Sequence, residues 1–220
     1  MRALVACEKS GVLRRALRDR GVEAFSCDLE PSDDDSEFHI IGDAVETAYV
    51  DIWSVMVCHP ECRFLSASGL HWNTRPGYEW RQAETEKAVD FALSLWRAPV
   101  KAKILENPRG KLGAVLSGAQ RRYIVQPWML GDDASKETFL FCDNIELLPI
   151  NPALRLDGRI AVDPRNGRRV ERWSNETDAG QNRLSPSEDR AAKRAETYPG
   201  IANWIADSIA AWFGLERCAA

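Results

Sequence analysis

Residues 2–28, RALVACEKSGVLRRALRDRGVEAFSCD, contain the unit from which the rest of the fold can be extended. The apolar run RALVAC predicts a short buried strand, and LRRALRDRG predicts a helix that ends at Gly21. The next stretch, VEAFSC, predicts a second strand that Asp28 closes. A strand, a turn with Gly11, a helix and a second strand make a βαβ unit, which favours a parallel sheet.

Further strands and helices follow this unit along the chain. A helix is predicted over residues 79–97, and a last helix from about Ile201 to Phe213. Residues 118–129 are ambiguous, and residues 144–195 are rich in Pro, Gly, Asn and Arg without a clear period. Strand material is expected in four segments: HIIGDA (39–44), DIWSVMVCHP (51–60), KAKILENP (101–108) and ETFLFC (137–142). This alternation predicts a Rossmann-like α/β fold, a doubly wound and mostly parallel sheet whose ligands bind at the carboxyl ends of the strands.

Composition limits the class of protein. The 220 residues suit one α/β domain with a small appendage, and 45% hydrophobic and 28% charged residues are typical of a globular protein. No apolar run approaches the roughly 20 residues of a membrane helix, and MRALVACEKSG has no signal-peptide pattern, so we expect a cytoplasmic protein. The six scattered cysteines are expected to be reduced, with Cys7 and Cys27 buried as small hydrophobic side chains.

Charge is unevenly distributed along the chain. The net charge of −4 gives no general sign of nucleic-acid binding. Residues 28–46 hold eight acids and no Lys or Arg, whereas residues 151–195 hold ten Lys or Arg and seven Asp or Glu. A polyanion would therefore meet the later segment first, although a solvated, loop-rich surface explains the same pattern equally well.

The first turn and the acid after the second strand are candidates for nucleotide binding. The ACEKSG turn places a helix N-terminus beside a possible ligand, and Asp28 stands where an acid commonly binds a ribose hydroxyl. The turn holds one glycine, Gly11, so a plain βαβ unit with a solvated aspartate is an equally good interpretation.

Residues 55–69, VMVCHPECRFLSASG, carry a candidate nucleophile. Cys62 lies just past a strand end in a loop rich in Ser and Gly, where N–H dipoles can lower a thiol pKa. An inert thiol is one alternative. A zinc site is another, with ligands drawn from Cys58, His59, Cys62 and His71, but adjacent residues on a strand point to opposite faces.

Glu106 ends the apolar run of KAKILENP and precedes Asn107 and Pro108. A carboxylate at the end of a buried strand is costly unless it has a partner, which makes Glu106 a functional candidate. A carboxylate that caps a helix or pairs with an arginine is the structural alternative.

Taken in order, these landmarks resemble the DNA cytosine-C5 methyltransferase family. The resemblance rests on the first βαβ unit, Pro60-Glu61-Cys62 followed by Ser66, Glu106-Asn107-Pro108, and a segment from Leu130 to Phe141. PGIANWIADSIAAWF (199–213) is similar to the last helix of the family. More closely, the chain resembles small phage-type proteins labelled cytosine methyltransferases. It differs from the family by Glu8 and Lys9 in the glycine loop and by a recognition region of about fifty residues.

The resemblance implies a class I S-adenosylmethionine methyltransferase that acts on cytosine, most directly in DNA. It implies three parts: a catalytic core over 1–143, a short Arg-rich recognition segment over 144–198, and a C-terminal helix over 199–220 that returns to the core. The implied catalytic residues are Cys62 as the nucleophile, Glu106 as the residue that binds the cytosine base, and Lys136 near the Cys62 loop. If Glu106 donates a proton, burial would have to raise its pKa. The implied cofactor-binding residues are Glu8, Gly11, Asp28, Asp43, Pro60 and Asn203. The implied substrate-binding residues are Ser66, Asn107, Thr138, Arg172 and Trp173, with the Arg-rich stretch 155–172 on phosphates.

Three other functions stay open at this point. The same chemistry could act on a free cytosine nucleotide or on RNA, which the short recognition region and acidic net charge favour. A degenerate methyltransferase fold that binds nucleic acid or a partner would explain the altered glycine loop. A zinc-bound interaction domain is the third.

Overall fold

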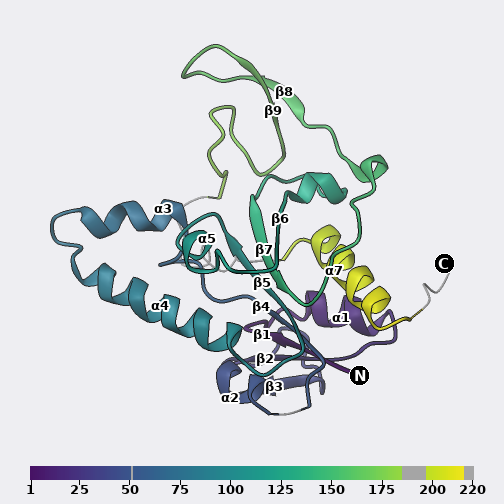
Figure 1. Cartoon of the computed structure of the whole chain (residues 1–220). Helices are drawn as coiled ribbons and strands as arrows, with labels where there is room; N and C mark the ends of the chain where they lie inside the picture. Colours follow the sequence, from purple (N-terminus) through teal and green to yellow (C-terminus); the bar gives the residue numbers. More distant parts are fainter. Residues whose placement is uncertain (51, 185–196, 216–220) are drawn as a thin grey trace.

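Seven strands form one sheet in the computed structural model, which describes residues 1–50, 52–184 and 197–215 (Figure 1). In space the order is β3-β2-β1-β4-β5-β7-β6. The strands from β3 to β5 pair in parallel, and β7 runs antiparallel between β5 and β6. The strands are β1 Arg2–Ala6, β2 Glu23–Asp28, β3 His39–Ile41, β4 Val55–Cys58, β5 Ala102–Pro108, β6 Arg121–Val125 and β7 Thr138–Asp143.

Helices cover both faces of this sheet. The α-helices are α1 Val12–Arg18, α2 Ala44–Ala48, α3 Ala67–Leu70, α4 Trp80–Trp96, α5 Leu112–Val115 and α7 Pro199–Trp212. Helices α1 and α7 pack side by side on one face, and α2 and α4 lie on the other (Figure 1). The predicted Rossmann-like, doubly wound, mostly parallel sheet is therefore confirmed, and its strand order with an antiparallel β7 is that of the class I S-adenosylmethionine methyltransferase fold.

The central strands are buried on both faces, which explains their almost continuous apolar sequences. On β1, Ala3 and Val5 belong to the core under α1 and α7, whereas Leu4 and Ala6 belong to the core under α2 and α4. Each fully buried aliphatic side chain contributes about 1.5–3 kcal/mol. Packing of the two cores holds the sheet in place, and the position of the sheet determines where the carboxyl ends of its parallel strands lie.

The two segments without a clear sequence pattern also contain regular structure. Residues 118–129 hold β6 and most of the 3-10 helix η2, Pro127–Leu130. Residues 144–195 include the 3-10 helix η3, Pro152–Leu154, and a hairpin of β8, Arg159–Val162, with β9, Arg169–Arg172. Figure 1 shows this hairpin standing away from the seven-stranded sheet. Its strands have only four residues each, RIAV and RVER, so apolar alternation is too short to reveal them.

Helix boundaries differ little from the sequence prediction. The helix expected over 79–97 is α4, and α7 begins at Pro199 with proline in its first turn, where a missing N–H costs nothing. The predicted segments 144–198 and 199–220 extend into 185–196 and 216–220, which lie outside the described residues, as does Cys218. Within the described part of the chain, no helix is long and apolar enough to cross a membrane.

Candidate active site at the carboxyl edge of the sheet

The carboxyl edge gathers the acids that the sequence singled out. Asp28 ends β2, and Asp43 follows β3 and accepts hydrogen bonds at the start of α2 from the Val45 and Glu46 amides, at 2.7 and 3.0 Å. Burial, helped by the charges of Asp28 and Asp43, raises the pKa of the Cys7 thiol to about 12. These two acids therefore lie beside the loop that follows β1, on the same edge of the sheet. Cys27 is buried as expected, whereas Cys7 is only partly buried.

The loop between β1 and α1 is tight and closed by a carboxylate. Cys7 and Gly11 both have left-handed backbones, with φ of 61° and 67°. Glu8 is only 4% exposed, and its carboxylate accepts hydrogen bonds from the amides of Leu13, at 2.7 Å, and Arg14, at 3.3 Å. Glu8 therefore satisfies free N–H groups at the start of α1, and its predicted contact with a cofactor stays a prediction.

Glu106 lies near the end of β5 with partners from two other segments, the one after β4 and the one at the start of β7. Its side chain is 17% exposed, and one oxygen lies 3.4 Å from Nδ1 of His59. Burial raises the pKa of Glu106, but the hydrogen bond from His59, the charge of Lys136 and a hydrogen bond from Thr138 outweigh it and leave the pKa below its usual value. The raised pKa that proton donation would require is therefore not the one that these partners give Glu106.

The Cys62 loop is fastened to the chain that follows Glu106. Asn107 is buried and donates from Nδ2 to the carbonyl oxygen of Pro60 at 2.9 Å. Two backbone hydrogen bonds of 2.8 Å follow, from the Lys111 amide to the Leu65 oxygen and from the Ala67 amide to the Arg109 oxygen. Asn107 and the 109–111 turn therefore hold the Cys62 loop against the exit of β5.

Gly110 makes this close approach possible. Ser66 and Gly110 form an isolated β-bridge. A Cβ at position 110 would overlap the Leu65 carbonyl oxygen and lie 2.9 Å from Cα of Ser66. Only glycine lets the two backbones meet here.

Helix α4 supports the Cys62 loop from its other side. Arg81 is buried and donates to the carbonyl oxygens of Arg63 and Gly69, both at 3.4 Å. The Thr85 hydroxyl lies 3.2 Å from the carbonyl oxygen of Phe64. The loop is therefore held by hydrogen bonds from two elements before any ligand binds.

Two buried polar atoms at this edge have no hydrogen-bond partner among the described residues. They are Nε2 of His59, whose Nδ1 faces Glu106, and Oδ1 of Asn107, the residue that follows Glu106 on β5. An unsatisfied buried polar atom costs about 1–3 kcal/mol, so such atoms mark places where a polar ligand or water belongs.

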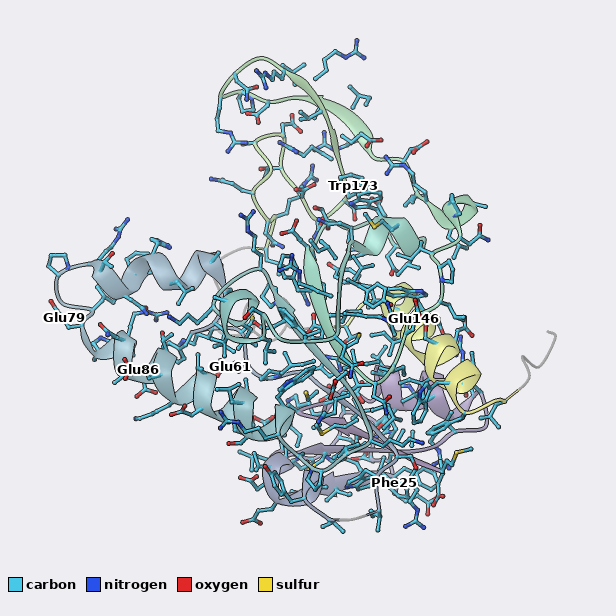
Figure 2. The ribbon with its side chains drawn as sticks, in the orientation of Figure 1. Phe25, Glu61, Glu79, Glu86, Glu146 and Trp173 are labelled. Atoms are coloured by element: carbon cyan, nitrogen blue, oxygen red, sulfur yellow. The ribbon has the colours of Figure 1, made fainter. Side chains whose placement is uncertain are left out.

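Arg172 and Trp173, which were predicted to contact the substrate, make contacts within the chain. Trp173 is 7% exposed, stacks on Trp128 at a centroid distance of 5.0 Å, and donates from Nε1 to the Leu156 oxygen. Figure 2 shows it where the β8–β9 hairpin meets the rest of the chain. Arg172 is held by Asp163 and by the carbonyl oxygen of Asp178. Both side chains fasten the hairpin, and their contacts with a substrate stay predictions.

Most arginines of residues 155–172, which were expected to bind phosphates, form ion pairs with acidic residues of the same region. Ion pairs join Arg155 to Asp157 and Glu171, Arg159 to Asp178, and Arg165 to Asp163. The predicted role of the 155–172 stretch in binding phosphates is correspondingly weakened.

Three more of the predicted site residues, Ser66, Thr138 and Asn203, lie in different parts of the structure. Ser66 precedes α3 and lies 3.2 Å from the hydroxyl of Ser68. Thr138 is buried and acts on Glu106, as described above. Asn203 lies on the exposed side of α7.

The side chains that could have formed a zinc site do not converge on one point. The thiol of Cys58 is buried in the sheet and lies 3.6 Å from the Ile104 oxygen, and burial raises its pKa well above the usual value. His59 turns to Glu106 instead. Among the described residues, no group of three His, Cys, Asp or Glu side chains is arranged to hold a metal ion.

Sequence reasoning missed the positioning residues of the site. The sequence pattern suggests His59 only as a zinc ligand and indicates no role for Arg81. The signal for Arg81 is an arginine one helical turn from Thr85 on a predicted helix, which by itself predicts no partner.

No family model matches the chain, and no curated protein matches it. Among solved structures, the chain is similar to the Dnmt2 methyltransferase of S. pombe, with a TM-score of 0.39 and 13% identity over 66% of this chain and 50% of that one. It is also similar to a putative DNA modification methyltransferase encoded within an E. coli prophage, with a TM-score of 0.40 and 11% identity over 64% of this chain and 46% of that one. The chain spans about half the length of these proteins. The strand order, and not these distant likenesses, defines the fold.

Proposed function

We propose that the protein transfers a methyl group from S-adenosylmethionine to C5 of cytosine in DNA. One observation carries this proposal: the loop with Cys62 is fastened by Asn107 and by the 109–111 turn directly to the strand end that holds Glu106. A thiol and a carboxylate held at one strand edge are the two groups that addition to a cytosine ring requires.

The residues at the edge fit the cofactor in part. Asp28 and Asp43, at the ends of β2 and β3, would hold the ribose and the adenine, as acids at this edge do for nucleotides in doubly wound sheets. Gly11 and Pro60 lie in the adjacent loops, and Asn203 on α7. When bound, S-adenosylmethionine would supply an electrophilic methyl group.

Cys62 would make the ring carbon nucleophilic. Its thiolate would add to C6 of cytosine, the electron pair of the C5–C6 bond would let C5 take the methyl group, and the bond from that methyl group to the sulfonium sulfur of the cofactor would break. Loss of the C5 proton and of the Cys62 thiolate restores the aromatic ring. Since a paired base cannot reach the thiol, the target nucleotide must be flipped out or single-stranded.

Glu106 would hold the edge of the ring. As a carboxylate it accepts a hydrogen bond from the cytosine amino group, and binding near ring N3 would raise its pKa until it shares a proton with that nitrogen. His59, Thr138 and Lys136 orient the carboxylate and offset its charge. They are positioning residues in this account.

Labelled S-adenosylmethionine tests the proposal directly. The protein is incubated with duplex DNA, single-stranded DNA, RNA and dCMP, and the label is followed into 5-methylcytosine. Transfer to DNA supports the proposal. Transfer to RNA or dCMP alone would show the same chemistry on another substrate, which the net charge of −4 and the ion-paired hairpin arginines favour.

A protein that binds without catalysis is the second candidate. Glu8 closes the N-terminus of α1, so two amides that could face a cofactor are already bonded. Calorimetric titration with S-adenosylmethionine separates the two candidates. Measurable binding favours the enzyme, and its absence under saturating conditions favours the degenerate fold.

A further inference from the structure

Residues 63–81 form an arm that continues directly from the Cys62 loop. It comprises α3, the 3-10 helix η1 (His71–Thr74), and the start of α4. Figure 2 shows Glu79 at its tip, far from the sheet, and Glu61 close to the sheet. The arm carries three arginines against one glutamate, in a chain whose net charge is −4.

The rings of the arm are numerous and partly open to solvent. Trp80 is 51% exposed and Tyr78 is 39% exposed. Tyr78 lies 5.2 Å from Trp72, over which the guanidinium of Arg75 sits at 4.4 Å. Exposed tryptophan and tyrosine beside arginine form a surface on which flat rings can stack.

This surface begins close to Cys62. The ring of Trp80 lies 6.2 Å from that of Phe64, which is two residues after Cys62. Arg81, next to Trp80, donates to the carbonyl oxygen of Arg63. If a DNA strand placed its target cytosine near Cys62, the nucleotides next to that cytosine would therefore lie over Trp80.

Single-stranded DNA is the ligand that fits this arm. Stacking needs open base faces, which a duplex offers only at its ends, and the hairpin arginines that would grip a duplex backbone are mostly ion-paired with acids. We propose that the 63–81 arm binds an unpaired DNA strand, with bases beside the target stacked on Trp80 and Tyr78. The choice of DNA rests on the proposed function, whereas the preference for unpaired bases rests on the arm alone.

Binding of a fluorescently labelled oligonucleotide tests this inference. The full chain, without S-adenosylmethionine, is titrated with a single-stranded cytosine-containing DNA and with its duplex, and Kd is read from anisotropy. We expect tighter binding of the single strand. Trp80→Ala should weaken it about ten-fold or more, the usual effect of losing one stacking ring, while Trp80→Phe stays close to the unchanged protein.

Tyr49 offers a matched control for Tyr78. Tyr49 is 48% exposed at the end of α2, away from the arm. Tyr78→Ala should weaken single-strand binding, and Tyr49→Ala should not. Circular dichroism and melting temperature of each variant confirm that the fold is retained.

Salt dependence separates stacking from charge. The loss caused by Trp80→Ala should be the same at low and high salt, whereas Arg75→Ala should reduce the salt slope. Equal or tighter binding of the duplex, or an unchanged Kd for Trp80→Ala, would overturn the inference. The arm could instead be a contact between copies of the chain. In that case Trp80→Ala would change the sedimentation of the protein without changing DNA binding, and this result would also overturn the inference. Failure of methyl transfer would count against the proposed function alone, because this test measures binding.

Discussion

Replacement of Gly110 by alanine tests how closely the Cys62 loop must be held. The new Cβ would overlap the carbonyl oxygen of Leu65 and lie 2.9 Å from both the Leu65 carbonyl carbon and Cα of Ser66, whereas real Cβ contacts essentially never fall below 3.0 Å. The loop must therefore move by about 1 Å, and a misplacement of that size can cost about 10²-fold in rate. The 2.8 Å bond from the Lys111 amide to the Leu65 oxygen would be strained, at a cost of about 1 kcal/mol.

Gly113 supplies the matched control. It lies in α5, and a Cβ there would meet nothing within 4 Å. Gly113→Ala should therefore keep full activity and raise the free energy of unfolding by about 0.5–1 kcal/mol. Methyl transfer and urea unfolding are measured on both variants. If Gly110→Ala turns over like the unchanged protein, the packing of the Cys62 loop on the 109–111 turn does not position the reaction.

Three further predictions concern single side chains. Glu106→Gln should lower the rate by about two to three orders of magnitude with little change in melting temperature, because Gln keeps the volume and can still accept hydrogen bonds; a large stability loss with normal turnover would make Glu106 structural. Glu8→Ala should lower the free energy of unfolding by about 1–2 kcal/mol through loss of the α1 cap, measured by urea unfolding, and an unchanged value would contradict the capping role. Iodoacetamide at pH 8 should modify the partly exposed Cys62 before Cys7 and Cys142, whose thiol pKa burial raises to about 12, as peptide mass mapping would show; prior labelling of Cys7 would contradict this.

The parts of the fold that follow from local pattern were predictable. The first βαβ unit places Asp28 at a strand end because a buried parallel strand must be apolar until it leaves the sheet. The same reasoning places Glu106 at the end of β5, on the same edge. Both positions depend on neighbours within a few residues, and the sequence contains those neighbours.

The parts that depend on distant partners were not predictable. The lowered pKa of Glu106 comes from His59, 47 residues earlier, and from Lys136, 30 residues later, so burial alone suggested the wrong direction. Trp173 was expected to be free for bases, but Trp128 occupies its face. A tryptophan in a polar segment has the same local sequence whether it stacks on a ligand or on the protein.

The role of Cys62 is tested most directly with DNA that carries 5-fluorocytosine at the target position. Fluorine on C5 cannot leave as a proton does, so the thiolate that added to C6 stays bonded after methyl transfer. We expect a denaturant-stable complex of protein and DNA that forms only with S-adenosylmethionine, maps to the peptide with Cys62, and is lost in Cys62→Ala. A stable complex at another residue, or full methyl transfer to ordinary cytosine by Cys62→Ala, would contradict it.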